Sequence, residues 1–143
     1  MKPTILFVDD EPHVTHSLTR ALYGRPYALL RAHSSQEALA LLAQQPIDIV
    51  IADEKMPGLS GSELLALVRK QFPHTIRMIL TGQASIEAAV RAINEGAIHR
   101  WLMKPCGTME LLEAIEATLK DQASRVSTDT VLRVLKQDSE PPP

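Results

Sequence analysis

Short apolar runs alternate with amphipathic segments along most of this chain. The run that begins at Ile47 is apolar at nearly every position, which predicts a strand buried on both faces of a parallel sheet, and four other short runs are also predicted as strands. The predicted strands are Thr4–Val8, Tyr27–Ala32, the run from Ile47 that ends at Asp53, Thr75–Leu80 and Ile98–Leu102. Arg31 interrupts the second run, so we expect this strand to lie nearer the edge of the sheet.

Each predicted strand is followed by a segment with apolar residues at helical spacing. Pro12 suits the first turn of the first helix, and Ser34 and Ser60 each begin a capping-box pattern. Gly96 fits the position just after the fourth helix. The predicted apolar helix faces are Val14, Leu18, Ala21 and Leu22; Ala38, Leu41 and Leu42; Leu64, Leu67 and Val68; Ile86, Ala89, Val90 and Ile93; and Leu111, Leu112, Ile115 and Leu119.

Five strand–helix units with short connections predict an α/β fold, with helices on both faces of a parallel sheet. Fold frequency favours the flavodoxin-like (βα)5 doubly wound sheet with strand order 2-1-3-4-5. We expect residues 1–121 to form this domain. Residues 122–143 are expected to be a polar C-terminal tail or linker, in which Val131, Leu132 and Leu135 allow a short helix.

Composition narrows the functional classes. A chain of 143 residues is one domain by length, and its formal net charge of -2 argues against a broad binding surface for nucleic acid. The single cysteine, Cys106, excludes an internal disulfide framework and a CxxC motif, and is expected to be a structural thiol. No apolar run approaches the length of a membrane span and no signal-peptide pattern is present, so a cytoplasmic location is expected.

Polar residues with chemical options follow four of the five predicted strands. They are Asp9 and Asp10 after the first, Asp53 after the third, Thr81 after the fourth and Lys104 after the fifth. Because the carboxyl ends of parallel strands open on the same edge of a sheet, we expect these side chains to share one crevice.

Three carboxylates in one crevice repel one another. At about 4 Å and an effective dielectric near 20, each pair costs roughly 4 kcal/mol, so the cluster requires a cation or a proton. Oxygen ligands at a shallow site suit Mg²⁺, which shares its shell with a substrate phosphate. Lys104 and Thr81 offer an ammonium group and a hydroxyl to a phosphoryl group. Asp53 is then the attacking carboxylate, which predicts an aspartyl-phosphate.

The ordered motifs resemble the receiver domain of two-component response regulators, including the chemotaxis regulators. They are Asp9-Asp10-Glu11-Pro12, Asp53-x-x-Met56-Pro57-x-x-x-Gly61, Thr81-Gly82 and Lys104-Pro105, and the match covers about residues 3 to 120. The resemblance implies that Asp53 is the phosphorylation site. It also implies that Asp10, Asp53 and the backbone carbonyl of Lys55 bind Mg²⁺ (or Mn²⁺) directly, and that Asp9 helps through a water molecule.

The same resemblance implies which residues bind the phosphoryl group and which side chain changes conformation in response. Thr81 and Lys104 are expected to coordinate the phosphoryl oxygens, and the Lys104–Pro105 peptide bond is expected to be cis. Trp101 lies three residues before Lys104, where the family has an aromatic switch. Movement of Thr81 toward the phosphate would let this ring turn inward.

The resemblance also implies partners. A histidine kinase or a phosphotransfer protein would donate the phosphoryl group, and a homodimer through the fourth helix, fifth strand and fifth helix is a family expectation. Stretches such as Ile79-Leu-Thr-Gly-Gln-Ala look most like receivers fused to HD-GYP phosphodiesterase domains. The sequence has neither a His-Asp dipeptide nor a Gly-Tyr-Pro, so the output partner stays unknown. We expect the chain to be either a stand-alone receiver or a shortened form of a longer protein.

We do not expect an enzyme with a separate substrate, since receivers promote only their own Mg²⁺-dependent phosphorylation and dephosphorylation. Lys55 and Gln83 lie two residues after Asp53 and Thr81, at positions that border the path of hydrolytic water in the family. A long Lys55 side chain there predicts a slow-to-moderate autodephosphorylation rate.

The same residues allow three other interpretations. A receiver-like protein-binding module that is not phosphorylated is the first, and the presence of all the acids and Lys104 weighs against it. The second is a flavodoxin-like cofactor protein, whose phosphate cradle needs hydroxyls and amides where this chain has Asp9 and Asp10. The third is a transition-metal site at His13 and His16, although solvated histidines on the first helix are the simpler account.

Overall fold

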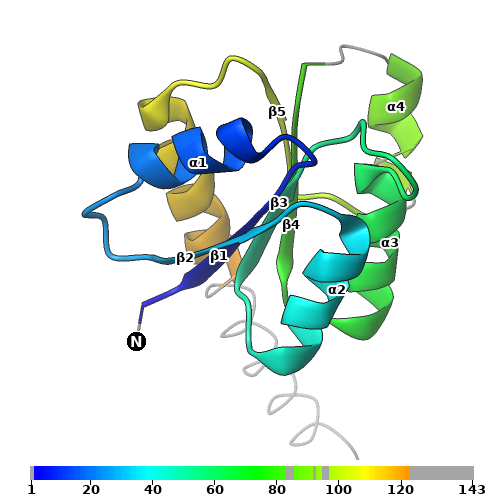
Figure 1. The fold of residues 1–143 in the computed structure, drawn as a ribbon, viewed down its shortest axis with the longest axis horizontal. Coiled ribbons are helices and arrows are strands. Elements are labelled where there is room, and N and C mark those ends of the chain that lie inside the picture. Colours follow the sequence, from blue (N-terminus) through cyan, green and yellow to red (C-terminus); the bar gives the residue numbers. More distant parts are fainter. Residues whose placement is uncertain (1, 83–85, 92, 95–96, 123–143) are drawn as a thin grey trace, which may run out of the picture.

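The computed structural model describes residues 2–82, 86–91, 93–94 and 97–122. A five-stranded sheet forms the centre and helices flank it (Figure 1). The strands are β1 (Thr4–Val8), β2 (Ala28–Ala32), β3 (Ile49–Ala52), β4 (Ile76–Thr81) and β5 (Arg100–Met103). The helices are α1 (Pro12–Ala21), α2 (Ser35–Gln44), α3 (Gly61–Gln71), α4 (Ile86–Arg91) and a C-terminal helix whose described part covers residues 108–122.

The strand order is β2-β1-β3-β4-β5 and every pair is parallel, which confirms the predicted doubly wound fold. β2 lies at one edge of the sheet, as the interruption by Arg31 indicated. β1 and β3 are neighbours, with Val8 opposite Ala52 at their carboxyl ends. The crevice of a doubly wound sheet opens where the strand order reverses, and in this sheet the order reverses between β1 and β3.

Two apolar clusters fill the space between the sheet and its helices. One joins alternate residues of β1 and β3 to the apolar faces of α2 and α3, including Leu64 and Val68. The other joins the opposite faces of the strands to Leu22 and to Leu111 and Ile115 of the C-terminal helix. Figure 1 shows these two helix layers on opposite sides of the sheet. β1, β3 and β4 are therefore buried on both faces, whereas the edge strands β2 and β5 are partly exposed.

The helix starts follow the predicted signals, with one difference. At α3, the Ser60 hydroxyl accepts the Glu63 amide and the Glu63 carboxylate accepts the Ser60 amide, so the capping box is complete. At α2, Ser34 accepts the Glu37 amide, but the Glu37 carboxylate accepts the amide of His33 instead. The Glu37 carboxylate therefore bonds the amide one residue before the N-cap, and the capping box at α2 is incomplete.

The expectations for the fourth unit need correction. The predicted face of the fourth helix included Val90 and Ile93, yet these side chains are 49% and 58% exposed. α4 ends at Arg91, so Ile93 no longer follows the α-helical spacing. β5 begins at Arg100 rather than Ile98. The Arg77 amide on β4 donates to the ring of His99 instead of to a main-chain carbonyl of the neighbouring segment. Gly96 lies outside the described residues.

The C-terminal helix ends its described part at the edge of the sheet where the strands begin. The side-chain amide of Gln122 donates to the carbonyl of His74, just before β4. None of the helices among the described residues is long and apolar enough to span a membrane.

The turn between β3 and α3 depends on a close approach of two backbone segments. A Cβ atom added to Gly61 would lie 2.3 Å from the carbonyl oxygen of Asp53. The Gly61 amide also donates to the carbonyl of Glu54 over 2.9 Å. Only glycine therefore permits α3 to begin this close to the end of β3.

We predict that Gly61→Ala destabilises the fold by about 1–3 kcal/mol, because the added methyl group overlaps backbone that has little room to move. Gly107→Ala is a matched control, since a Cβ there meets no atom within 4 Å and φ is not positive. Urea denaturation followed by circular dichroism measures both free energies of unfolding. Equal stability of the two variants would contradict the close approach.

Candidate functional site

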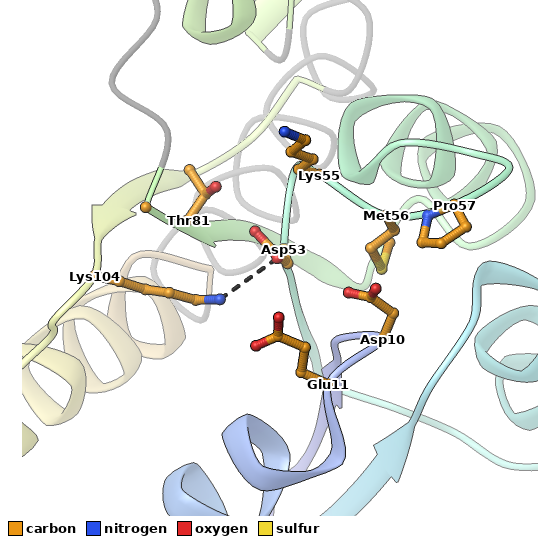
Figure 2. A pocket seen from close by; sticks show the side chains of 9 residues that line it. Asp10, Glu11, Asp53, Lys55, Met56, Pro57, Thr81 and Lys104 are labelled. Atoms are coloured by element: carbon orange, nitrogen blue, oxygen red, sulfur yellow. Dashed lines mark hydrogen bonds and ion pairs between the residues drawn. The ribbon is translucent and has the colours of Figure 1, made fainter.

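The carboxyl ends of β1, β3, β4 and β5 surround a cleft of about 650 Å³. Figure 2 shows side chains from these ends pointing into it from the surrounding loops. The residues that line it are Asp10, Glu11, Asp53, Lys55, Met56, Pro57, Thr81, Gly82 and Lys104. The predicted crevice at this edge of the sheet is therefore present.

Asp9, Asp10 and Asp53 form the acidic part of the site. One carboxylate oxygen from each lies within 4.8 Å of those of the other two. Asp9 is only 3% exposed, whereas Asp10 is exposed to solvent. Three negative charges at this separation repel strongly, and repulsion of this kind favours binding of a cation.

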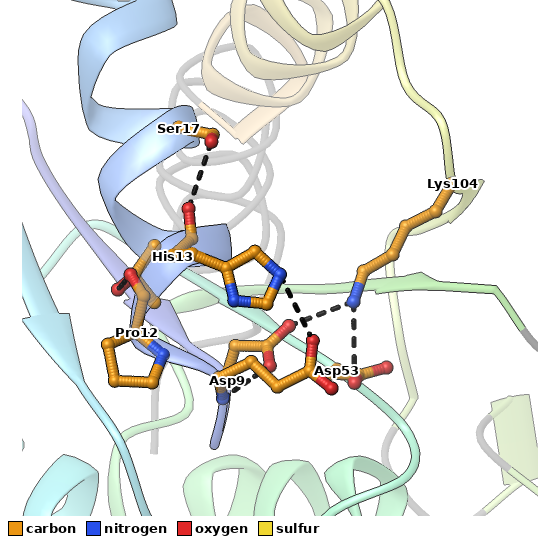
Figure 3. A network of polar contacts seen from close by, with 8 residues as sticks. Asp9, Pro12, His13, Ser17, Asp53 and Lys104 are labelled. Carbon is orange, nitrogen blue, oxygen red and sulfur yellow. Dashed lines mark hydrogen bonds and ion pairs between the residues drawn. The ribbon is translucent and has the colours of Figure 1, made fainter.

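Lys104 supplies a positive charge to this cluster from β5. Its ammonium group lies 2.9 Å from Asp9 Oδ2 and 3.4 Å from Asp53 Oδ2. Figure 3 marks both contacts with dashed lines. Burial alone lowers the pKa of Lys104, but the hydrogen bond to Asp9 and the charges of Asp53 and Asp9 outweigh it. The pKa of Lys104 is therefore raised, and the ammonium group stays charged at neutral pH.

The turn from β1 into α1 fixes the second carboxylate oxygen of Asp9. The Glu11 amide donates to Asp9 Oδ1 over 3.0 Å. The Glu11 carboxylate lies 3.4 Å from the His13 ring, which rises from the first turn of α1 in Figure 3. With Lys104 on its other oxygen, Asp9 is held on both sides and cannot turn freely toward the cleft.

The loop after Asp53 is anchored by the next residue. Glu54 is 6% exposed, and its carboxylate accepts the backbone amide of Ser62 over 3.0 Å and the Ser62 hydroxyl. This carboxylate occupies the start of α3, where unpaired amides and the helix dipole favour negative charge. Asp53 and Glu54 are thus adjacent acids that point to different places, one to the cleft and one to the helix.

Thr81 and Trp101 lie on the two strands beside Asp53. Thr81 is buried at the end of β4 and lines the cleft, and its carbonyl accepts the Lys104 amide over 2.9 Å. Trp101 is half-buried on β5 opposite Ile79, and its ring packs against the cluster between the sheet and α2 and α3. The structure therefore brings Thr81 and Lys104 into the site and leaves Trp101 behind it.

The predicted positions of the remaining site residues can be compared directly. Lys55 lies on the rim of the cleft with an exposed side chain, and the Lys104–Pro105 peptide bond is cis as expected. Burial and the nearby Glu110 raise the pKa of the Cys106 thiol, in keeping with a structural thiol. Gln83 lies outside the described residues.

The structure does not join His13 and His16 in one site. His13 faces Glu11, whereas the His16 ring contacts the Arg31 guanidinium on β2. Among the described residues, the group of side chains placed to share a metal ion is Asp9, Asp10 and Asp53. The transition-metal interpretation therefore has no structural support.

Strand ends alone do not reveal two residues at the site, Glu11 and Glu54, or the contact made by His33 after β2. Glu11 lines the cleft, and Glu54 anchors the loop after Asp53. His33 follows β2 directly, and its ring contacts the Thr15 hydroxyl over 3.2 Å. The sequence does show His33 directly after the second predicted strand, but the capping-box pattern at this point begins at Ser34.

Residues 5–116 match the response regulator receiver domain family. The chain belongs to this family. Its members are the phosphoacceptor domains of two-component systems and bind Mg²⁺ at an acidic cluster, for which Asp9, Asp10 and Asp53 are the corresponding group here. The match decides against a flavodoxin-like cofactor protein.

Curated relatives include longer regulatory proteins. The chain is 33% identical over 119 residues to the hydrogenase transcriptional regulatory protein HoxA of Cupriavidus necator, covering 83% of this chain and 24% of that protein. It is 34% identical over 119 residues to the transcriptional regulatory protein GlrR of Escherichia coli, covering 83% of this chain and 27% of that protein. The chain thus spans about a quarter of the length of these relatives.

Solved receiver structures match nearly over their full length. The signal receiver domain of an HD domain-containing protein from Pseudomonas fluorescens has a TM-score of 0.84 at 39% identity, covering 87% of this chain and 99% of that one. A CheY-like receiver from Methanospirillum hungatei has a TM-score of 0.83 at 30% identity, with the same coverage of 87% and 99%.

We predict that Asp10→Asn stabilises the domain in EDTA by roughly 1 kcal/mol, because it removes one charge from the acidic cluster. The gain is below that of a buried pair, since Asp10 is exposed. Millimolar Mg²⁺ should raise the melting temperature of the parent and leave that of Asp10→Asn nearly unchanged. Differential scanning fluorimetry measures both effects.

Asp121→Asn is the control, because it removes an exposed acid from the C-terminal helix, away from the cleft. This variant should keep the Mg²⁺ response of the parent. A parent that does not respond to Mg²⁺, or an Asp10→Asn variant that responds equally, would contradict a metal site at the acidic cluster.

Proposed function

We propose that Asp53 accepts a phosphoryl group from a histidine kinase or a phosphotransfer protein, in a reaction that requires Mg²⁺ or Mn²⁺. The observation that carries this proposal is the cleft itself, in which Asp53 lies between an acidic group and Lys104. A carboxylate that only bonded neighbouring backbone, as Glu54 does, would have no such surroundings.

In the proposed transfer, a carboxylate oxygen of Asp53 forms a bond to phosphorus while the bond from phosphorus to the donor's imidazole nitrogen breaks. The electron pair of that bond stays with the imidazole. A cation bound at the acids would supply positive charge to them and to the transferring group. Asp10, Asp53 and the backbone carbonyl of Lys55 would hold it, and Asp9 would act through a water molecule.

Lys104 and Thr81 complete the proposed site from the other side. Lys104 already spans Asp9 and Asp53, so a phosphoryl group on Asp53 would arrive within reach of its ammonium group. The Thr81 hydroxyl would bond a second phosphoryl oxygen. Because Thr81 pairs with Met103 beside Trp101, its movement is expected to change the surface around β5.

We further propose residues 1–121 as the receiver domain and 122–143 as a tail or linker. The likeness to a receiver from an HD domain-containing protein supports the proposed sub-family of receivers fused to HD-GYP domains. An unknown output partner and dimerisation through α4, β5 and the C-terminal helix stay predictions. So do a cytoplasmic location and the expectation that the chain binds neither nucleic acid directly nor a membrane. We propose no substrate other than the domain itself, which promotes its own phosphorylation and dephosphorylation.

We predict that Asp53→Asn abolishes phosphorylation by a small phosphodonor with Mg²⁺, because the amide lacks the nucleophilic carboxylate. Intact mass spectrometry measures the added phosphoryl group. Asp48→Asn is the matched control at the opposite end of the same strand, where the side chain accepts the Thr4 amide. Labelling of Asp53→Asn at the parent's level would show that the assignment is wrong.

This experiment also tests the alternative, a receiver-like binding module that is not phosphorylated. That module would show no added mass in the parent, and it would fail to bind Mg²⁺ together with a phosphoryl mimic such as beryllofluoride.

We predict that Lys55→Ala shortens the half-life of the phosphorylated domain severalfold. The exposed Lys55 side chain on the rim of the cleft can pair with the phosphoryl group and obstruct water. Phosphate release after removal of the phosphodonor measures the rate, and Lys70→Ala, at an exposed position on α3, is the control. A half-life that changes little in Lys55→Ala would remove this role.

A further inference from the structure

Two side chains of β5 lie on the same face of the sheet. Successive residues of a strand point to opposite faces, so Trp101 and Met103 share one face while Leu102 points to the other. The clusters agree with this alternation, because Trp101 packs on the side of α2 and α3 and Leu102 on the side of the C-terminal helix.

The two side chains are joined by a hydrogen bond. The indole N–H of Trp101 donates to the thioether sulfur of Met103 over 3.3 Å. An indole has one donor and no acceptor, so this sulfur satisfies its single polar group. Met103 is 36% exposed, which leaves it free of the tight packing that would hold a core methionine in place.

Met103 also connects Trp101 to the cleft through the backbone. Its register partner on β4 is Thr81, which lines the cleft. The next amide, that of Lys104, donates to the Thr81 carbonyl. One residue therefore pairs with Thr81 through its main chain and with Trp101 through its side chain.

We propose that Met103 is a positioning residue that holds the Trp101 indole in the conformation of the unphosphorylated domain. The inference rests on the proposed function, in which the indole turns when Asp53 is phosphorylated. A ring that turns must leave the Met103 sulfur, so the N–H···S bond stabilises the resting state alone. Any interaction present in only one of two states shifts their populations by its own free energy.

The chain supplies its own probe, because Trp101 is the single tryptophan. Tryptophan fluorescence, titrated with beryllofluoride in the presence of Mg²⁺, measures the affinity for the mimic. Met103→Leu keeps the size of the side chain and removes the acceptor. It should shift the emission of the free protein and bind the mimic about two- to tenfold more tightly, the range expected from loss of one neutral hydrogen bond.

Two further variants separate the hydrogen bond from packing. Met103→Gln restores an acceptor for the indole N–H and should return the affinity to within about twofold of the parent. Met109→Leu, at a methionine that is 74% exposed on the C-terminal helix, should match the parent throughout. Melting temperatures should stay within a few degrees in all three variants, because no core contact is removed.

The outcomes distinguish this inference from the proposed function. If the parent responds to the mimic and Met103→Leu binds it with the same affinity, the inference is overturned and the function stands. If Met103→Gln shifts as far as Met103→Leu, the effect is packing and the inference is again overturned. A parent that gives no response to the mimic and no mass gain at Asp53 overturns both.

Discussion

Repulsion among three carboxylates at one edge of the sheet is the constraint on which the site depends. Asp9, Asp10 and Asp53 lie close together because β1 and β3 are parallel neighbours whose carboxyl ends coincide. Lys104 offsets part of this charge from β5, at 2.9 Å and 3.4 Å from two of the acids. The negative charge that remains favours binding of a cation in the cleft.

The supporting structure keeps these acids in place despite their repulsion. The Glu11 amide and Lys104 hold the two oxygens of Asp9, and Glu54 anchors the following loop to Ser62 at the start of α3. Gly61 permits this loop to lie against the carbonyl of Asp53. Strain from like charges is therefore balanced by a local network of hydrogen bonds and by the buried strands behind it, as is common where function requires an unfavourable arrangement.

Much of this arrangement could be predicted from the sequence, since it follows from local rules. Continuous apolar runs indicate buried parallel strands, and parallel strands bring Asp53, Thr81 and Lys104 to one edge. The contacts of Glu54, His33 and Met103 could not be predicted, because each depends on neighbouring elements or on the direction of a side chain. The exposed Val90 and Ile93 show the same limit, since helical spacing does not say which face a neighbour covers.

The contact between Gln122 and His74 fixes where the described chain ends relative to the cleft. His74 precedes β4, whereas Asp53 follows β3, so the two lie at opposite ends of the parallel strands. Gln122 therefore lies at the far side of the domain from the cleft. A change of shape at the cleft would therefore have to act through the packed strands and helices to alter the contact between Gln122 and His74.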